Sequence, residues 1–366
     1  MKRRLWALAL ALILLLAGCG KKGEEPNPSA SVQPTVTPDT SPTPTATPEP
    51  STPPVVVDTA INPLTGLPLP EGANATQRPV AVMLNNIRKA LPQQGNSQAD
   101  IIYEVLAEGG ITRMLGVYQS MDGVGEVGSV RSSRPYYLEL ALGLDAIYLH
   151  AGGSEEAYAD IVKWNVTALD CVRTTAYSKI FWRDQGRLKN NGYEHSVLTS
   201  GEAIMENFPS YDFRKDHTEG YSLPYTFAED GTPAGGADAT VIRVPFSTVK
   251  TGVFTYDAER KKYLVEEYGK PLVDGNNGEQ VAVTNVVTIR TSCKTIDDYG
   301  RLRVDLSGYS GDGWFACGGK MVEITWEKKD LNSPLTYALT DGTPVVFGQG
   351  NSYVNIIPLS NEAKAE

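Results

Sequence analysis

The stretch between residues 20 and 58 sets the strongest limit on what this chain can fold into. It contains no aromatic residue and is dominated by proline, threonine and serine, as in SVQPTVTPDTSPTPTATPEPSTPP. A segment of this composition cannot bury enough apolar surface to offset the entropy lost on ordering, and its prolines favour extended conformations. We therefore predict a disordered linker over residues 20–58 and a folded part that begins near residue 59.

The segment before the linker has the features of an export signal. Three basic residues at positions 2–4 precede an apolar run over residues 5–16, which is short for a transmembrane helix and is followed by small residues. Residues 16–19 read LAGC and resemble the lipobox of bacterial lipoprotein precursors. We predict a lipoprotein signal peptide over residues 1–19 and a lipid on Cys19 that anchors the protein to the extracytoplasmic face of the cell membrane. The alternative is an uncleaved anchor with an incidental cysteine.

The charge of the chain limits its partners. The formal net charge is −10, with 41% hydrophobic and 21% charged residues, as in ordinary soluble domains. A surface of this sign repels nucleic acid, so we expect no nucleic-acid partner and expect any anion to bind at a local basic pocket. Besides Cys19 there are three cysteines, and Cys293 and Cys317 form either a disulfide or two buried thiols. The sequence does not indicate an oligomeric state.

The first folded part, residues 59–236, alternates strand-like and helix-like segments. Strands are predicted over residues 79–84, 99–107, 112–119, 146–149, 166–172 and 178–182. Helices are predicted over residues 135–142, with proline in the first turn, over residues 155–164 after Ser154, and from Ser200 to Asn207. This order predicts an α/β domain, a mixed sheet with flanking helices.

The second folded part, residues 237–360, is predicted to be a mostly antiparallel all-β domain. Short alternating runs such as ATVIRVPF, GVFTYD and MVEITWEK are separated by turn signals, and Thr232 to Gly236 mark the boundary before them. Two roles are open for the aromatic residues of this part: packing in its core or forming a sugar-binding face. These residues are Tyr256, Tyr263, Tyr268, Trp314 and Trp326.

Several long runs carry a resemblance to a known family. These runs are NPLTGLP, RPVAVMLNN, SQADIIYEVLAEGGITR and VGSVRSSRPYYLELALGLDAIYLHAGGS. Together with the later β-rich block, they resemble the YerB-like family of bacterial surface lipoproteins over most of residues 60–358. The resemblance implies an α/β N-terminal domain and a separate C-terminal domain, and it implies no established reaction. The chain departs from the family at residues 188–195, where the stretch before His195 is longer than usual.

Residues 104–153 hold the candidate binding site. Arg131 and Arg134 flank the predicted start of the helix at Pro135, where free backbone N–H groups and two guanidinium groups suit a phosphate or carboxylate. His150 ends a predicted strand, and ligands of open α/β sheets bind beyond the carboxyl ends of strands. Arg113 and Glu108 complete the predicted ligand-binding set. Arg113 is expected to orient Glu108. The sequence therefore predicts a cleft in the first domain for an anionic cell-envelope ligand.

Two other functions remain open at this point. One is an envelope phosphotransferase or hydrolase acting on polyprenyl-linked or cell-wall substrates, with His150 or His195 as the catalytic base. The other is a structural or partner-binding surface protein. Gly123, Gly125 and Gly128 match the spacing of a dinucleotide fingerprint, but no helix is predicted to open within them, so we expect no cofactor. The spacing of the histidines and cysteines favours no metal site.

Overall fold

The structure, a computed structural model, describes residues 60–366. The predicted signal peptide, Cys19 and the predicted linker lie outside these residues. Within the described part of the chain, no helix combines the length and the apolar character needed to cross a membrane.

Strand β1 (Val80–Asn86) is buried along its whole length because it separates two apolar clusters. Val80, Val82 and Leu84 face one cluster, while Ala81 and Met83 face the other. This alternation follows from the two-residue period of a strand. The strand thus lies inside a sheet that is covered on both faces, which explains the nearly continuous run of apolar residues in its sequence.

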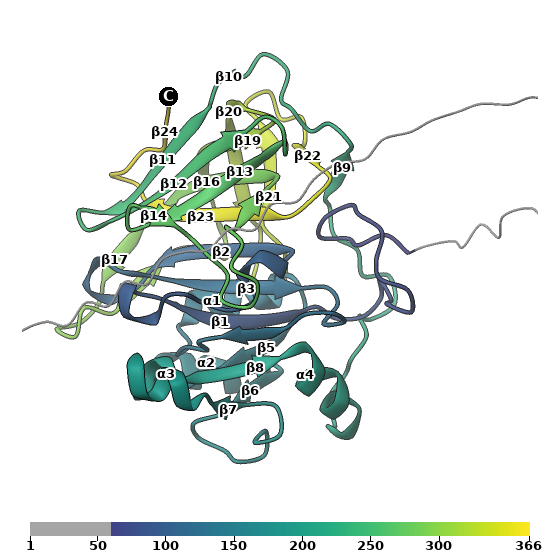
Figure 1. Ribbon diagram of the computed structural model, residues 1–366. Coiled ribbons are helices and arrows are strands. Elements are labelled where there is room, and N and C mark those ends of the chain that lie inside the picture. The colour runs from purple at the N-terminus through teal and green to yellow at the C-terminus, as the bar shows by residue number, and fades with distance from the viewer. Residues whose placement is uncertain (1–59) are drawn as a thin grey trace, which may run out of the picture. The chain divides into compact units, whose positions relative to one another are not determined.

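A large mixed sheet contains strands from both ends of the described chain (Figure 1). In order across the sheet the strands are β10 (Ala237–Asp238), β20 (Lys320–Lys328), β19 (Tyr309–Cys317), β16 (Asn285–Thr291), β23 (Ser352–Pro358), β2 (Ile101–Leu106), β3 (Thr112–Tyr118), β1, β5 (Ile147–His150) and β6 (Ala168–Asp170), and β21 (Thr336–Leu339) pairs with β20. Strand β23 pairs in parallel with both β2 and β16. Strands from both sides of residue 236 therefore share one sheet.

Four smaller sheets complete the β structure. The largest contains β14 (Lys270–Pro271), β13 (Lys262–Glu267), β12 (Lys250–Asp257), β11 (Val241–Ser247), β24 (Lys364–Ala365) and β15 (Ala282–Val283). The others are β4 (Glu126–Gly128) with β8 (Val197–Ser200) and β7 (Trp182–Arg183), β17 (Cys293–Thr295) with β18 (Leu302–Val304), and β22 (Val346–Gly348) with β9 (Thr226–Ala228). All pairs in the β11–β15 sheet are antiparallel, as expected for this half of the chain.

The helices are short, and their start signals can be read in the sequence. They are α1 (Pro135–Gly143), α2 (Glu155–Lys163), α3 (Gln185–Asn190) and α4 (Gly201–Asn207), with 3-10 turns at Arg88–Ala90, Asn96–Gln98, Glu108–Gly110, Tyr193–His195 and Phe208–Ser210. Ser154 Oγ accepts a hydrogen bond from Ala157 N–H at 3.2 Å, and Ser200 Oγ accepts one from Ala203 N–H at 3.1 Å. Both serines therefore cap the helices that follow them, as their sequence predicts.

Two local details differ from or refine the expectations. The strand predicted over residues 178–182 is mostly wrong, since only Trp182–Arg183 forms a strand. The residues before it are folded into turns, in which Ser178 N–H donates to the Thr175 carbonyl and Ile180 N–H donates to the Tyr177 carbonyl.

Cys293 and Cys317 are free thiols, and burial raises their pKa values to about 12 and about 11.

Candidate functional site

The segment at residues 130–133 lies beside the loop that follows β5. Ala151 N–H donates to the Arg131 carbonyl at 3.0 Å, and Ser133 N–H donates to the Gly152 carbonyl at 2.8 Å. These bonds bring the start of α1 to the carboxyl end of β5. The two segments together form one wall of a cavity.

This cavity has a volume of about 390 Å³, and three arginines line it. Such a volume lies within the range of small-molecule sites. Arg131 comes from the segment before α1, Arg173 from the loop after β6, and Arg183 from β7. Other lining residues that matter for its chemistry are Ser132, Gly152, Gly153, Tyr158, Tyr193 and Glu194. We refer to it below as the arginine cavity.

Aromatic rings hold two of the arginines in place. The Arg173 guanidinium carbon lies 3.2 Å from the centroid of the Tyr158 ring, and that of Arg183 lies 3.5 Å from the centroid of the Tyr193 ring. Arg183 also donates to the Tyr193 carbonyl at 2.8 Å. Within residues 60–366, neither arginine has a carboxylate within ion-pair distance. Stacked guanidinium groups keep their N–H edges available for an anion.

The third arginine is engaged by an exposed carboxylate. Arg131 Nη2 lies 3.0 Å from Glu194 Oε2, and the Glu194 side chain is 65% exposed. An ion pair this exposed to solvent contributes at most about 1 kcal/mol. An anionic ligand can therefore displace Glu194 from Arg131 at a small energetic cost.

Asp170 connects the loops that follow β5 and β6. Its carboxylate accepts hydrogen bonds from Gly152 N–H at 2.9 Å, Tyr158 Oη at 2.7 Å and Val172 N–H at 2.9 Å. Burial acts to raise the pKa of Asp170, but the hydrogen bond from the Gly152 N–H and those from Tyr158 and Val172 lower it overall. The backbone of Gly152 has a φ of +81°, a conformation that favours glycine and directs its N–H to this carboxylate. An ionised Asp170 thus fixes both loops.

Three of the residues predicted to bind a ligand form a network outside the arginine cavity. Glu108 Oε1 lies 2.5 Å from Arg134 Nε, and Glu108 Oε2 lies 3.1 Å from Arg113 Nη2. Burial acts to raise the pKa of Glu108, but the two arginines lower it overall. Arg113 also donates to the Ser132 carbonyl at 2.7 Å, and Arg134 donates to the Ser133 carbonyl at 2.6 Å. The network therefore holds the backbone that carries Arg131.

His150 is 1% exposed and lies behind the cavity wall. Its Nδ1 is 2.8 Å from the Gly152 carbonyl, so Nδ1 carries a proton and donates it in a hydrogen bond. Burial lowers the pKa of His150, which keeps the ring neutral near pH 7. The ring therefore supports the Gly152 loop.

His195 is also buried, next to the end of β1. Asn85 Nδ2 donates to its Nδ1 at 2.7 Å, and burial, followed by the charge of Arg131, lowers its pKa. His217 Nδ1 lies 2.8 Å from Asp145 Oδ2. In the described part of the chain, no group of three or more histidine, cysteine, aspartate or glutamate side chains is placed to hold a metal ion.

Among the predicted site residues, Arg131 lines the arginine cavity, while Arg113, Arg134, Glu108, His150 and His195 do not. Sequence reasoning missed Arg173 and Arg183. One signal for Arg173 was present: β5 and β6 are parallel neighbours with His150 opposite Asp170, so the loops after them meet at one sheet edge. Pairing the two predicted strands in this way places Arg173 beside the Gly152 loop.

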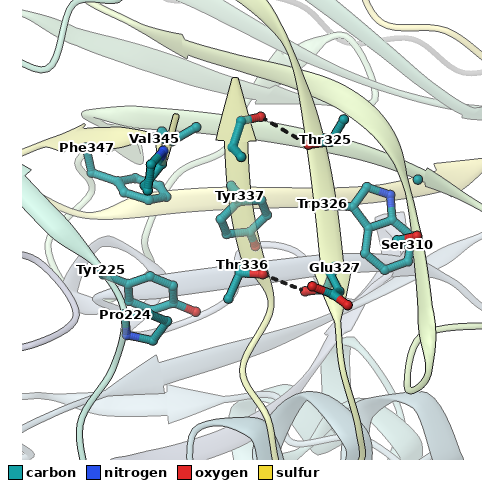
Figure 2. A pocket seen from close by; sticks show the side chains of 13 residues that line it. Pro224, Tyr225, Ser310, Thr325, Trp326, Glu327, Thr336, Tyr337, Val345 and Phe347 are labelled. Atoms are coloured by element: carbon teal, nitrogen blue, oxygen red, sulfur yellow. Dashed lines mark hydrogen bonds between the residues drawn. The ribbon is translucent and has the colours of Figure 1, made fainter. Parts of the chain in front are cut away.

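A larger cavity, of about 660 Å³, lies along β20 and β21 and has aromatic walls (Figure 2). Trp326, Tyr337 and Tyr225 contribute to it, but Tyr256, Tyr263, Tyr268 and Trp314 do not. Trp326 Nε1 donates to the Arg290 carbonyl at 3.1 Å and Tyr225 Oη donates to the Leu335 carbonyl at 3.1 Å. Figure 2 shows Thr325 and Thr336 hydrogen-bonded to neighbouring strands as well. These polar groups serve the fold, and Glu327 is the one charged residue among those that line the cavity.

Comparison with known proteins identifies relatives over most of the chain. Residues 64–214 match the N-terminal domain, and residues 242–354 the C-terminal domain, of the "Protein of unknown function (DUF3048)" family. The chain is 33% identical over 309 residues to "Putative lipoprotein YerB" of Bacillus subtilis (strain 168), which covers 81% of this chain and 86% of that protein. The crystal structure of YerB protein from Bacillus subtilis superposes with a TM-score of 0.70 at 28% identity, covering 83% of this chain and 99% of that chain.

Proposed function

The chain belongs to the DUF3048 family of YerB-like lipoproteins, and from this premise we propose that it is a surface-anchored protein that binds an anionic cell-envelope ligand in the arginine cavity. The ligand group is a phosphate or carboxylate. Arg131, Arg173 and Arg183 hold it.

One observation carries this proposal: three guanidinium groups from separate segments line a single cavity. Guanidinium groups bind carboxylates and phosphates with two parallel hydrogen bonds. The chain carries a net charge of −10, so three arginines around one cavity form a local exception to its overall charge. A basic cavity on an acidic protein concentrates a small anion without attracting polyanions over the whole surface.

The residues around the cavity support this function by positioning it. The network of Glu108, Arg113 and Arg134 holds the segment that carries Arg131, and His150 supports the Gly152 loop. Preorganised donors bind more tightly than mobile ones because less side-chain entropy is lost on binding.

The proposed location rests on the residues at the start of the chain and on the lipoprotein relative. In this proposal, lipid on Cys19 anchors the protein at the extracytoplasmic face of the membrane, and the linker over residues 20–58 holds the folded part away from it. The lipoprotein relative supports this placement. The ligand is then a component of the cell envelope.

Calorimetric titration tests the proposal with an oligomer of glycerol phosphate as the probe and a neutral glycan of similar size as its control. Arg131→Ala should weaken binding of the oligomer at least about tenfold, because a charge-assisted hydrogen bond contributes roughly 1.5–3 kcal/mol. Its melting temperature should stay nearly unchanged, since the partner of Arg131 is exposed. Arg243→Ala removes an equal charge from an exposed pair with Glu366 and should bind like the wild type. Equal weakening in both variants contradicts the proposal.

A further inference from the structure

Lys250, Glu104 and Glu267 form a cluster whose three side chains are all completely buried. Lys250 Nζ lies 2.8 Å from Glu104 Oε1 and contacts Glu267 Oε2. The cluster shares no residue with the arginine cavity. It lies where β2 of the large sheet meets the β12–β13 hairpin.

The register of the hairpin brings two of these residues together. Lys250 begins β12 and Glu267 ends β13, and the antiparallel register places Glu267 opposite Gly252. Lys250 is two residues from Gly252, so its side chain is on the same face and diagonal to Glu267. Such diagonal pairs are within reach of long side chains.

The charges of the cluster do not balance when all three side chains are in their usual ionised forms. Two carboxylates face one ammonium group, and the rings of Phe246 and Tyr268 lie 5.6 Å and 5.0 Å from Lys250 Nζ. Uncompensated charge in such surroundings strongly disfavours the fully ionised cluster. In the described residues, Glu267 Oε1 also has no hydrogen-bond partner. Burial lowers the pKa of Lys250 against the opposing effect of Glu104, which favours the neutral, nucleophilic amine.

Glu104, in contrast, is well supplied with donors. Its carboxylate accepts hydrogen bonds from Thr112 Oγ1 and Tyr353 Oη, both at 2.5 Å, and from Asn86 Nδ2 at 2.9 Å. These three donors stabilise one buried negative charge. Glu104 is thus a fully hydrogen-bonded carboxylate of the cluster, whereas Glu267 Oε1 has no partner among the described residues.

We propose that Lys250 and Glu267 are joined by an intramolecular isopeptide bond, and that Glu104 transfers the protons of the reaction. The neutral Lys250 amine attacks Cδ of the protonated Glu267 carboxyl group, and a C–N bond forms. Glu104 takes a proton from the nitrogen and delivers it to the departing hydroxyl group, which leaves as water. The products are one amide and one water, and Glu104 is again a carboxylate. No oxidant, reductant or cofactor enters the balance.

The bond removes two ionisable groups from an apolar site. It leaves Glu104 as the single charge of the cluster, held by its three donors. The amide also links the ends of β12 and β13 covalently, so the hairpin cannot separate when the chain is stretched or heated.

Peptide mapping of the denatured full chain tests the proposal. Trypsin cleaves after lysine and arginine except before proline, so a free Lys250 gives a linear peptide that ends at this residue. The bonded protein should instead give a branched peptide of residues 244–260 joined to residues 263–290, one water lighter than the two parts together. Recovery of the linear peptide ending at Lys250 overturns the proposal. A branched peptide in which Lys250 is joined to Asn86 instead of Glu267 also overturns it.

Two variants separate the roles of the residues. Glu104→Gln keeps the shape of the side chain but cannot accept the proton, so the linear peptide should replace the branched one. Persistence of the branched peptide in Glu104→Gln overturns the role of Glu104. Lys328→Met is the matched control: Lys328 is also fully buried, but its Nζ donates to the carbonyls of Asp330, Leu331 and Ser333. This variant should keep the branched peptide. If Glu104→Gln fails to fold, the map of the unchanged protein still decides the question.

Discussion

Arg173 lies over the ring of Tyr158, with its guanidinium carbon 3.2 Å from the ring centroid. Tyr158 in turn donates a hydrogen bond to Asp170, which also accepts one from the backbone N–H of Arg173 at 3.2 Å. The side chain and the backbone of Arg173 are therefore fixed by two neighbours that are themselves bonded to each other. This arrangement orients the guanidinium group before any ligand arrives.

Because Arg173 stacks on Tyr158, we predict that ligand binding requires the planar shape of the Arg173 side chain as well as its charge. Arg173→Lys keeps the charge but loses the planar group, so binding of the glycerol phosphate oligomer should weaken about tenfold. The melting temperature should change little because Arg173 is exposed. Calorimetric titration measures the affinity, and Arg303→Lys, at an exposed pair with Glu156, is the control. Unchanged affinity in Arg173→Lys would mean that the stacked group is not a ligand contact.

Glu108 should matter for stability because it neutralises two arginines. Glu108→Ala leaves Arg113 and Arg134 without a carboxylate partner, although their side chains are only 5% and 12% exposed. Removing one partner of a fully buried ion pair costs about 3–5 kcal/mol, and the 22% exposure of Glu108 lowers the expected loss to roughly 2–3 kcal/mol. Chemical denaturation measures the free energy of unfolding. Glu366→Ala breaks the exposed pair with Arg243 and should cost at most about 1 kcal/mol.

His150 should make the protein less stable in mild acid. Burial lowers its pKa below the ordinary value of 6.5, so below pH 6.5 the unfolded chain binds a proton that the folded chain does not. Stability from this residue is complete above pH 6.5 and falls as the pH decreases toward the folded pKa, by up to about 1.4 kcal/mol per pH unit. His150→Asn should reduce this slope between pH 7 and pH 5, as measured by denaturation at each pH. An identical slope in both proteins contradicts a buried neutral histidine.

The sequence predicted the local elements better than their neighbours in the sheets. The serines before α2 and α4 and the proline at the start of α1 mark helix starts that depend on nearby residues alone. The pairing of β2 with β23 places Ile101 opposite Ser352, 251 residues further along the chain, and no local signal specifies such a partner. The shared sheet across residue 236 was therefore beyond what periodicity could predict.

The candidate site shows the same limit. Arg131 was predicted from its place before a helix, and this location depends on local sequence. Arg173 and Arg183 lie just outside the strands predicted over residues 166–172 and 178–182, and their approach to Arg131 follows from tertiary packing. Arg134 has the same local context as Arg131, but Glu108 binds it from a different part of the chain. Composition and spacing do not distinguish an arginine that lines a cavity from one that is held in a structural network.

The most direct test of the account is the position of an anion in the protein. Crystals soaked in selenate allow the anion to be located by the anomalous scattering of selenium. A selenate ion is expected in the arginine cavity, within hydrogen-bond distance of at least two of the guanidinium groups of Arg131, Arg173 and Arg183. Selenate bound elsewhere on the surface, with none in this cavity, would contradict it.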